Sequence, residues 1–195
     1  MDFLDQLNRK VLLKKSLSRI VSLVPSQTEL LVDLGLEDRI VGVTKFCVHP
    51  THIKNQKTVV GGTKKVHFNK IKVLLPDIII CNKEENTEEM VAELETIAPV
   101  WVSDIKNISD CLEMISAFGE LFSVEKKSKK IIKKIEREQG SFKTSIADSP
   151  NIKIAYLIWK DPYMAAGNNT FINELLKLNK FENIFAGRKQ RYPEI

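Results

Sequence analysis

The chain has 195 residues, of which 43% are hydrophobic and 28% are charged, as in an ordinary folded globular protein. It carries 30 basic and 25 acidic side chains, for a net charge of +5. No apolar stretch approaches the ~20 residues that a membrane-crossing helix needs. Length, composition and charge therefore exclude a disordered chain, a collagen-like chain and a membrane-spanning protein.

Strand and helix patterns alternate near the amino terminus. Arg19–Val24 predicts a buried strand, and Ser26 with Glu29 predicts a capping box at the start of a helix. A second strand is predicted at Ile40–Val43. The later elements are a helix at 69–75, a strand at 78–81, a helix capped by Asn86 and Glu89, and a strand at 100–102. Strands that alternate with helices predict an α/β lobe with a parallel sheet over residues 1–105.

A long helical pattern follows this lobe. Apolar residues at helical spacing predict one helix from Ile108 to about Gln139, within a connecting segment at 106–140. A helix of ~30 residues at ~1.5 Å each is about 45 Å long, which would make it a rigid strut. A polar loop is predicted at Gly140–Pro150.

The last segment, 150–195, repeats the element order of the first lobe. It predicts a strand at Ile152–Trp159, a capped helix at Thr170–Leu178 and a short strand at Asn183–Phe185. The pattern stops where the first lobe continues with a further helix and strand. We therefore expect a second α/β lobe that is incomplete in this sequence.

Six segments of the sequence carry a family resemblance. They are Arg19–Glu29, Val41–Pro50, Val60–Thr63, Leu75–Ile79, Met164–Phe171 and Glu182–Phe185. In their order and spacing they resemble the cobalamin and iron-siderophore binding proteins of ABC importers, over nearly the whole chain. The resemblance implies two Rossmann-like lobes with parallel sheets joined by one long rigid helix, the helical-backbone type of periplasmic binding protein.

The same resemblance implies a function. A metal-bearing ligand would be clamped between the lobes, with a corrinoid (cobalamin) expected before haem or a ferric siderophore. The protein would be a substrate-binding protein with no catalytic activity and no intrinsic cofactor, and its partner would be an ABC permease.

Candidate binding residues follow the carboxyl ends of the predicted strands of the first lobe, where open α/β sheets bind ligands. Ser26 opens a helix whose free amides suit an anion, although a capping box alone explains it. Cys47 and His49, with His52, are of the types that bind a metal, whether a structural ion or the metal centre of the ligand; packing of the thiol is the alternative. Phe46 in the same loop and the cations Lys64 and Lys65 complete this set.

Further candidates lie in the second lobe. Trp159 and Tyr163 offer flat side chains for a corrin or porphyrin face, and ordinary packing is the alternative. Arg188 is a candidate for acidic ligand groups, and Tyr192 is added as a further aromatic contact.

The location and the class of partner stay open at this stage. The acidic amino terminus and three widely spaced cysteines favour the cytoplasm, whereas the resemblance implies the periplasm. An intracellular carrier or sensor and a small α/β enzyme are the alternative functions. The lysine run at 126–134 predicts a solvated helix face or an anionic partner, and no motif indicates nucleic-acid binding.

Overall fold

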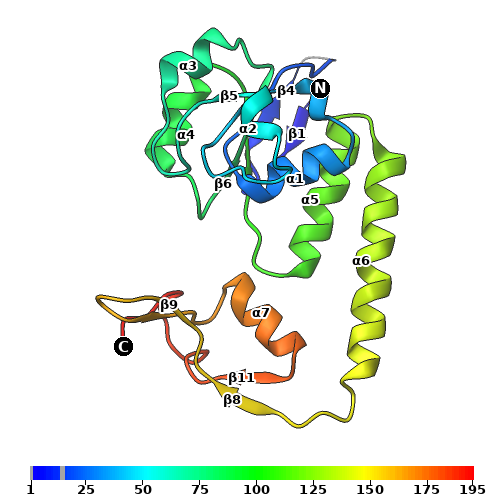
Figure 1. The fold of residues 1–195 in the computed structure, drawn as a ribbon, viewed down its shortest axis with the longest axis vertical. Coiled ribbons are helices and arrows are strands. Elements are labelled where there is room, and N and C mark those ends of the chain that lie inside the picture. The colour runs from blue at the N-terminus through cyan, green and yellow to red at the C-terminus, as the bar shows by residue number, and fades with distance from the viewer. Residues whose placement is uncertain (1, 14–15) are drawn as a thin grey trace. The chain divides into compact units, whose positions relative to one another are not determined.

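The computed structural model describes residues 2–13 and 16–195 (Figure 1), and these form two compact units. Unit 1 contains the residues up to Asp104 together with Ala117–Ser128. Unit 2 contains Ile105–Ser116 and Lys129–Ile195. Within the described residues, every helix is too short or too polar to cross a membrane.

The elements are bounded as follows. The strands of unit 1 are β1 (Asp2–Leu4), β2 (Lys10–Leu12), β3 (Ile20–Ser22), β4 (Ile40–Val43), β5 (Thr58–Val59), β6 (Ile78–Asn82) and β7 (Val100–Ser103). Its helices are α1 (Pro25–Asp33), the 3-10 helix η1 (Glu37–Arg39), α2 (Ile53–Gln56), α3 (Phe68–Val73) and α4 (Glu88–Glu95). Two helices, α5 (Ile108–Leu121) and α6 (Glu125–Ser145), contribute residues to both units. Unit 2 adds β8 (Ile152–Ile154), β9 (Leu157–Trp159), β10 (Met164–Ala165), α7 (Phe171–Leu178) and β11 (Phe181–Asn183).

A parallel five-stranded sheet forms the centre of unit 1, in the order β5-β4-β3-β6-β7. Val21 of β3 is paired with Gly42 of β4 on one side and with Ile79 of β6 on the other. The chain builds outward from β3 to β5, crosses back, and builds outward again from β6 to β7. The strand order therefore reverses between β3 and β6. The parallel pairing of all five strands confirms the predicted α/β lobe with a parallel sheet.

Helices cover both faces of this sheet. Val100 and Val102 of β7 belong to a buried cluster with Ile71 of α3 and Leu94 of α4. Trp101, which points to the other face because side chains alternate along a strand, packs edge-on against Phe118 of α5 at 5.9 Å between ring centroids. Helix α1 lies on this second face as well, since Thr28 donates a hydrogen bond to Ser22 (2.8 Å).

Two predicted helix caps in unit 1 are wrong. Helix α1 begins at Pro25 with Val24 as its N-cap and makes no side-chain capping bond, because the valine side chain has no hydrogen-bond acceptor. The predicted box of Ser26 and Glu29 is therefore not formed. Helix α4 is capped by Thr87, whose hydroxyl accepts a bond from the Met90 amide (3.3 Å), rather than by Asn86.

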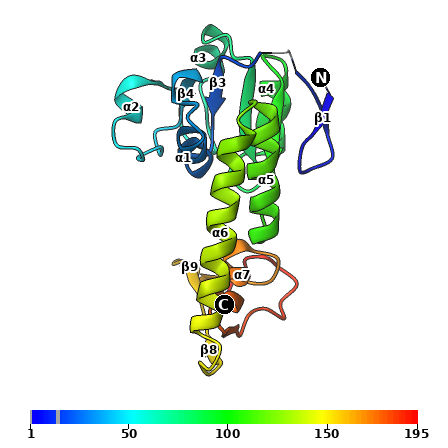
Figure 2. The same ribbon diagram turned by 90° about the vertical axis from the view of Figure 1, so that its right-hand side faces the viewer.

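The predicted single helix from Ile108 to Gln139 is two helices. Helix α5 ends at Leu121, Ser123 adopts a left-handed φ of 57°, and α6 begins at Glu125. The Val124 amide donates to the Gly119 carbonyl (2.8 Å), which closes the end of α5. Helix α6 then continues to Ser145 (Figure 2). The predicted loop at Gly140–Pro150 therefore begins too early in the sequence.

Unit 2 contains two small sheets. β8 pairs in parallel with β11, and β9 pairs with β10 in antiparallel fashion, so the predicted strand at Ile152–Trp159 is two strands in different sheets. The predicted helix is confirmed as α7, which Thr170 caps by accepting a bond from the Asn173 amide (3.1 Å). The last predicted strand lies slightly earlier, as β11.

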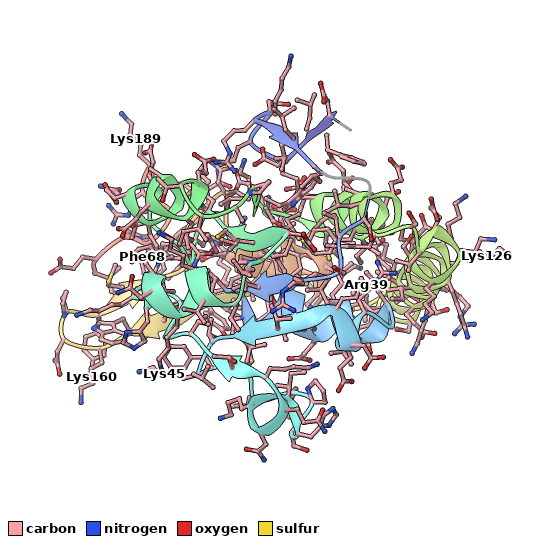
Figure 3. All side chains as sticks on the ribbon, turned by 90° about the horizontal axis from the view of Figure 1, so that it is seen from above. Arg39, Lys45, Phe68, Lys126, Lys160 and Lys189 are labelled. Carbon is pink, nitrogen blue, oxygen red and sulfur yellow. The ribbon has the colours of Figure 1, made fainter. Side chains whose placement is uncertain are left out.

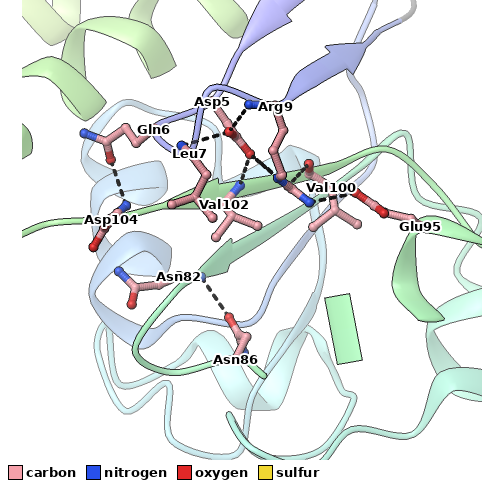
Figure 4. A network of polar contacts seen from close by, with 10 residues as sticks. All are labelled: Asp5, Gln6, Leu7, Arg9, Asn82, Asn86, Glu95, Val100, Val102 and Asp104. Atoms are coloured by element: carbon pink, nitrogen blue, oxygen red, sulfur yellow. Dashed lines mark hydrogen bonds and ion pairs between the residues drawn. The ribbon is translucent and has the colours of Figure 1, made fainter. Parts of the chain in front are cut away.

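An amino-terminal hairpin of β1 and β2, absent from the predicted elements, covers the edge strand β7 (Figure 4). The buried carboxylate of Asp5 accepts bonds from the amides of Leu7 (2.9 Å) and Val102 (3.2 Å). Arg9 binds the same carboxylate at 2.8 Å and donates to the Val100 carbonyl (3.0 Å). Side chains of the hairpin therefore satisfy edge groups of β7 that would otherwise lack a strand partner.

Candidate ligand-binding site

The loops after the five parallel strands of unit 1 meet at one edge of the sheet. Because all the strands run the same way, these loops lie at their carboxyl ends, and the strand order reverses between β3 and β6. In open α/β sheets this is the place where ligands bind. Most of the residues predicted for unit 1 lie in the loops after β3, β4 and β5: Ser26, Phe46, Cys47, His49, Lys64 and Lys65.

The loops after β4 and β5 pack on each other around Phe46. The Lys45 amide donates to the Gly61 carbonyl (2.7 Å), and the Phe46 ring lies so close to Gly62 that a Cβ there would be 3.2 Å from it. Gly61 has a φ of 131°, a conformation that favours glycine. The Lys45 ammonium is 5.0 Å from the centre of the Phe46 ring, which is 51% exposed. The structure thus holds a half-exposed aromatic ring beside a cation.

The loop after β6 joins the same cluster through Asn86. Its buried side chain donates to the Thr63 carbonyl and accepts from the Asn82 amide, each at 2.8 Å. Lys64 donates to the Glu84 carbonyl, while Lys65 is exposed. The bond to Glu84 ties Lys64 to the loop after β6. Lys45 and Asn86 were not among the predicted residues, although Lys45 lies in the same loop as the predicted Phe46 and Cys47.

Cys47 is fully buried, and its Sγ lies 3.3 Å from the hydroxyl oxygens of Thr28 and Thr44. His49 is exposed, and His52 pairs instead with Glu37 (Nε2 to Oε1, 2.7 Å). Among the described residues, no three His, Cys, Asp or Glu side chains are grouped to hold a metal ion. The side chains of the Cys-x-His-x-x-His segment are therefore not brought together in this structure. A contact of Cys47 or His49 with the metal of a bound ligand stays a prediction.

Ser26 lies in the first turn of α1 and is exposed. Its hydroxyl makes no capping bond, so helix capping, the alternative to ligand binding that the sequence left open, does not occur. The amides at this helix start and the exposed hydroxyl remain available to an anionic group.

In unit 2, three predicted residues lie in one small antiparallel assembly. Trp159 of β9 pairs with Met164 of β10, and the loop between these strands carries Tyr163. The segment after Tyr192 pairs with β10 in turn: the Ala165 amide donates to the Pro193 carbonyl (3.0 Å) and the Ile195 amide to that of Tyr163 (3.0 Å). Trp159 is 63% exposed and Tyr163 is 48% exposed, so much of each side chain is accessible to a ligand.

Arg188 is exposed and lies in the turn that follows β11, outside this assembly. Its amide donates to the Phe185 carbonyl (3.1 Å). Tyr192 is half-buried, with the guanidinium of Arg191 5.9 Å from its ring centre.

Two cavities lie away from all the predicted residues. One of about 440 Å³ is lined by residues 67–70 and Glu93, and one of about 380 Å³ lies between α5, α6 and α7. Neither lining contains a predicted binding residue.

Comparison with known proteins identifies the class. The family model for periplasmic binding proteins matches residues 20–195, and the chain belongs to this family. Its α/β fold, with a parallel sheet and covering helices, is that of the helical-backbone class, and this confirms the fold predicted from the sequence.

Individual relatives and solved structures are similar to this chain over most of its length. The chain is 29% identical over 191 residues to YvrC of Bacillus subtilis, an uncharacterized ABC transporter substrate-binding lipoprotein, covering 93% of this chain and 60% of that one. The vitamin B12 binding protein BtuF of Vibrio cholerae has a similar structure, with a TM-score of 0.82 at 23% identity over 92% of this chain and 70% of that one. A periplasmic heme binding protein of Pseudomonas aeruginosa gives a TM-score of 0.79 at 21% identity over 92% of this chain and 66% of that one. The chain spans 60% to 64% of the length of the first curated relatives that it matches.

Proposed function

We propose that this protein is the substrate-binding protein of an ABC importer and that it takes a metal-bearing cofactor or chelate. The family match over residues 20–195 carries the proposal. Relatives named for vitamin B12 and for heme support a corrinoid as the first candidate, with haem and then a ferric siderophore behind it.

In unit 1, the proposed contact surface is the carboxyl edge of the five-stranded sheet. The half-exposed ring of Phe46 suits the flat face of a macrocycle, and the tethered Lys64 and exposed Lys65 suit acidic substituents at its rim. Ser26 and His49 are exposed at the same edge and are proposed as polar contacts. Cys47 is a weaker candidate because its thiol is buried.

In unit 2, the proposed contact surface is formed by the exposed aromatic residues Trp159 and Tyr163, and by Tyr192, which precedes the segment that bonds to β10. Large aromatic side chains contribute most of the affinity in apolar ligand sites, and a few polar groups orient the ligand. Arg188 is proposed as a contact for an acidic group.

We propose no catalytic step and no resident cofactor: the ligand is bound and released unchanged. The relatives are named as binding proteins, periplasmic or lipoprotein, which supports an extracytoplasmic location and a permease partner and does not favour an intracellular carrier or sensor. An enzyme of the same fold remains the alternative, and recovery of the bound ligand in a chemically altered form would support it.

Isothermal titration calorimetry with cyanocobalamin, haemin and ferrichrome tests the proposal. We expect saturable one-to-one binding of one of them. Phe46→Ala and Trp159→Ala should each weaken binding about tenfold or more, because each removes a large ring from the ligand face. Val73→Ala is the matched control: Val73 is 79% exposed and lies at the end of α3 that leads into the amino end of β6, so its loss should leave affinity unchanged.

The absence of saturable binding by all three ligands would refute the proposed ligand class. Equal weakening by Val73→Ala and Phe46→Ala would refute the proposed surface while leaving the class intact.

A further inference from the structure

Helix α6 carries a dense group of basic side chains. Between residues 125 and 138 there are seven basic and three acidic residues, so this segment holds +4 of the net charge of +5 of the whole chain. We call its basic residues the α6 stripe: Lys126, Lys127, Lys129, Lys130, Lys133, Lys134 and Arg137.

These side chains share one face of the helix. At ~100° per residue they fall within an arc of about 160°, with Ile131, Ile132 and Ile135 on the opposite side. The three isoleucines are half-buried, whereas every member of the stripe is exposed, and Figure 3 shows Lys126 extending away from the helix. Along the axis the stripe spans about 17 Å.

The three glutamates of the segment offset part of the charge of the stripe, but few of its members form an ion pair with a carboxylate. Arg137 pairs with Glu138 (2.6 Å), but in the described part of the chain none of the six lysines forms an ion pair with a carboxylate. The glutamates of the segment lie at the borders of the arc rather than within it. Mutual repulsion among the lysines is unfavourable in the free protein, and an anionic surface would relieve it.

The chemistry of the stripe favours a lipid surface over nucleic acid. Six of its seven members are lysines, flexible point charges that suit a fluid array of headgroups, and the one guanidinium is already paired. No aromatic side chain lies within the stripe to stack on a base. We propose that α6 docks along its basic face on an anionic phospholipid membrane. The inference stands on charge and geometry alone and is independent of the ligand.

Vesicle co-sedimentation of the full chain tests this. The probes are vesicles of phosphatidylcholine with about 30 mol% phosphatidylglycerol and vesicles of phosphatidylcholine alone, at about 50 mM and about 500 mM salt, since screening separates charge attraction from insertion. The stripe variant is Lys126→Gln, Lys130→Gln and Lys133→Gln. The matched control, Lys10→Gln, Lys72→Gln and Lys153→Gln, removes the same charge from exposed lysines elsewhere.

We expect binding only to the anionic vesicles at low salt, a loss of at least tenfold in the stripe variant and a loss of less than threefold in the control. Absence of binding to anionic vesicles, or equal losses in the two variants, would overturn the proposal. So would tighter binding to a DNA duplex of about 20 base pairs than to the vesicles, with the same dependence on the stripe, because the partner would then be nucleic acid.

Discussion

Asp5 is the residue on which the amino-terminal hairpin depends. Its carboxylate is 4% exposed and accepts bonds from three backbone amides, those of Leu7, Arg9 and Val102, as well as from the Arg9 guanidinium. These bonds hold the hairpin to the edge strand β7 and keep that edge from pairing with another chain.

We therefore predict that Asp5→Ala lowers the free energy of unfolding by about 2–3 kcal/mol, because it leaves buried amide donors without an acceptor. Urea denaturation measures this. Asp2→Ala, at the exposed start of the same hairpin, is the control and should change stability by less than about 0.5 kcal/mol. Equal effects of the two changes would show that the Asp5 bonds do not stabilise the fold.

The three cysteines are predicted to differ in reactivity. Burial raises the pKa of Cys81, and burial together with the neighbouring charge of Asp110 raises the pKa of the half-buried Cys111. A raised pKa means less thiolate at a given pH, so both react more slowly than a free cysteine. Cys47 is fully buried and inaccessible to reagents.

Mass spectrometry after brief iodoacetamide treatment at about pH 8 checks this order. We expect slow labelling of Cys111, and labelling of Cys47 and Cys81 only after denaturation. Raising the pH should speed the reaction of Cys111, because its thiolate fraction grows toward its raised pKa. Rapid native labelling of Cys47 would contradict its burial and would make it available to a ligand.

Among the elements, α5 and α6 approach each other closely at a glycine. A Cβ built on Gly119 would lie 2.1 Å from the Oγ and 2.8 Å from the Cβ of Ser128, which is buried. Gly140 in α6 has nothing within 4 Å of the same position. A methyl group therefore has no room at Gly119 and ample room at Gly140.

We predict opposite signs for two identical substitutions. Gly119→Ala should destabilise the protein by about 1–3 kcal/mol through overpacking, whereas Gly140→Ala should stabilise it by about 0.5–1 kcal/mol through helix propensity. Thermal unfolding measures both. Adding Ser128→Gly to Gly119→Ala should recover part of the loss. Destabilisation of similar size at both glycines would argue against the close crossing.

The same elements show what the sequence could and could not predict. β3, β4, β6 and β7 were predicted because fully buried strands read as short runs of β-branched residues. The break at Ser123 was missed because the apolar helical spacing runs up to Phe122, the lysine-rich helical pattern resumes directly after the break, and no glycine or proline marks the turn. The hairpin was missed because its strands have three residues each and depend on distant bonds to β7.

For the candidate site, sequence order predicted which loops meet, because the carboxyl ends of parallel strands share an edge. It left open whether the Cys47 thiol packs inward, and it did not predict the contacts of that thiol with Thr28 and Thr44 or the pairing of His52 with Glu37. Those choices depend on side-chain packing between loops that are distant in the chain, which spacing alone does not encode.

At the scale of the whole molecule, the protein is a periplasmic-binding-protein fold of two α/β units, with its proposed ligand chemistry on exposed aromatic and basic side chains rather than on a catalytic group. Among the described residues there is no grouped metal-binding set. We propose affinity for a metal-bearing ligand from the family match and from the names of the relatives.

Equilibrium dialysis against cyanocobalamin, followed by mass spectrometry of the retained ligand, tests this central claim most directly. We expect saturable retention of one cyanocobalamin per chain. After denaturation of the protein, the ligand should be recovered chemically unchanged. Recovery of a chemically altered corrinoid would contradict binding without turnover and would indicate an enzyme. Failure to retain cyanocobalamin at any concentration would exclude a corrinoid as the ligand.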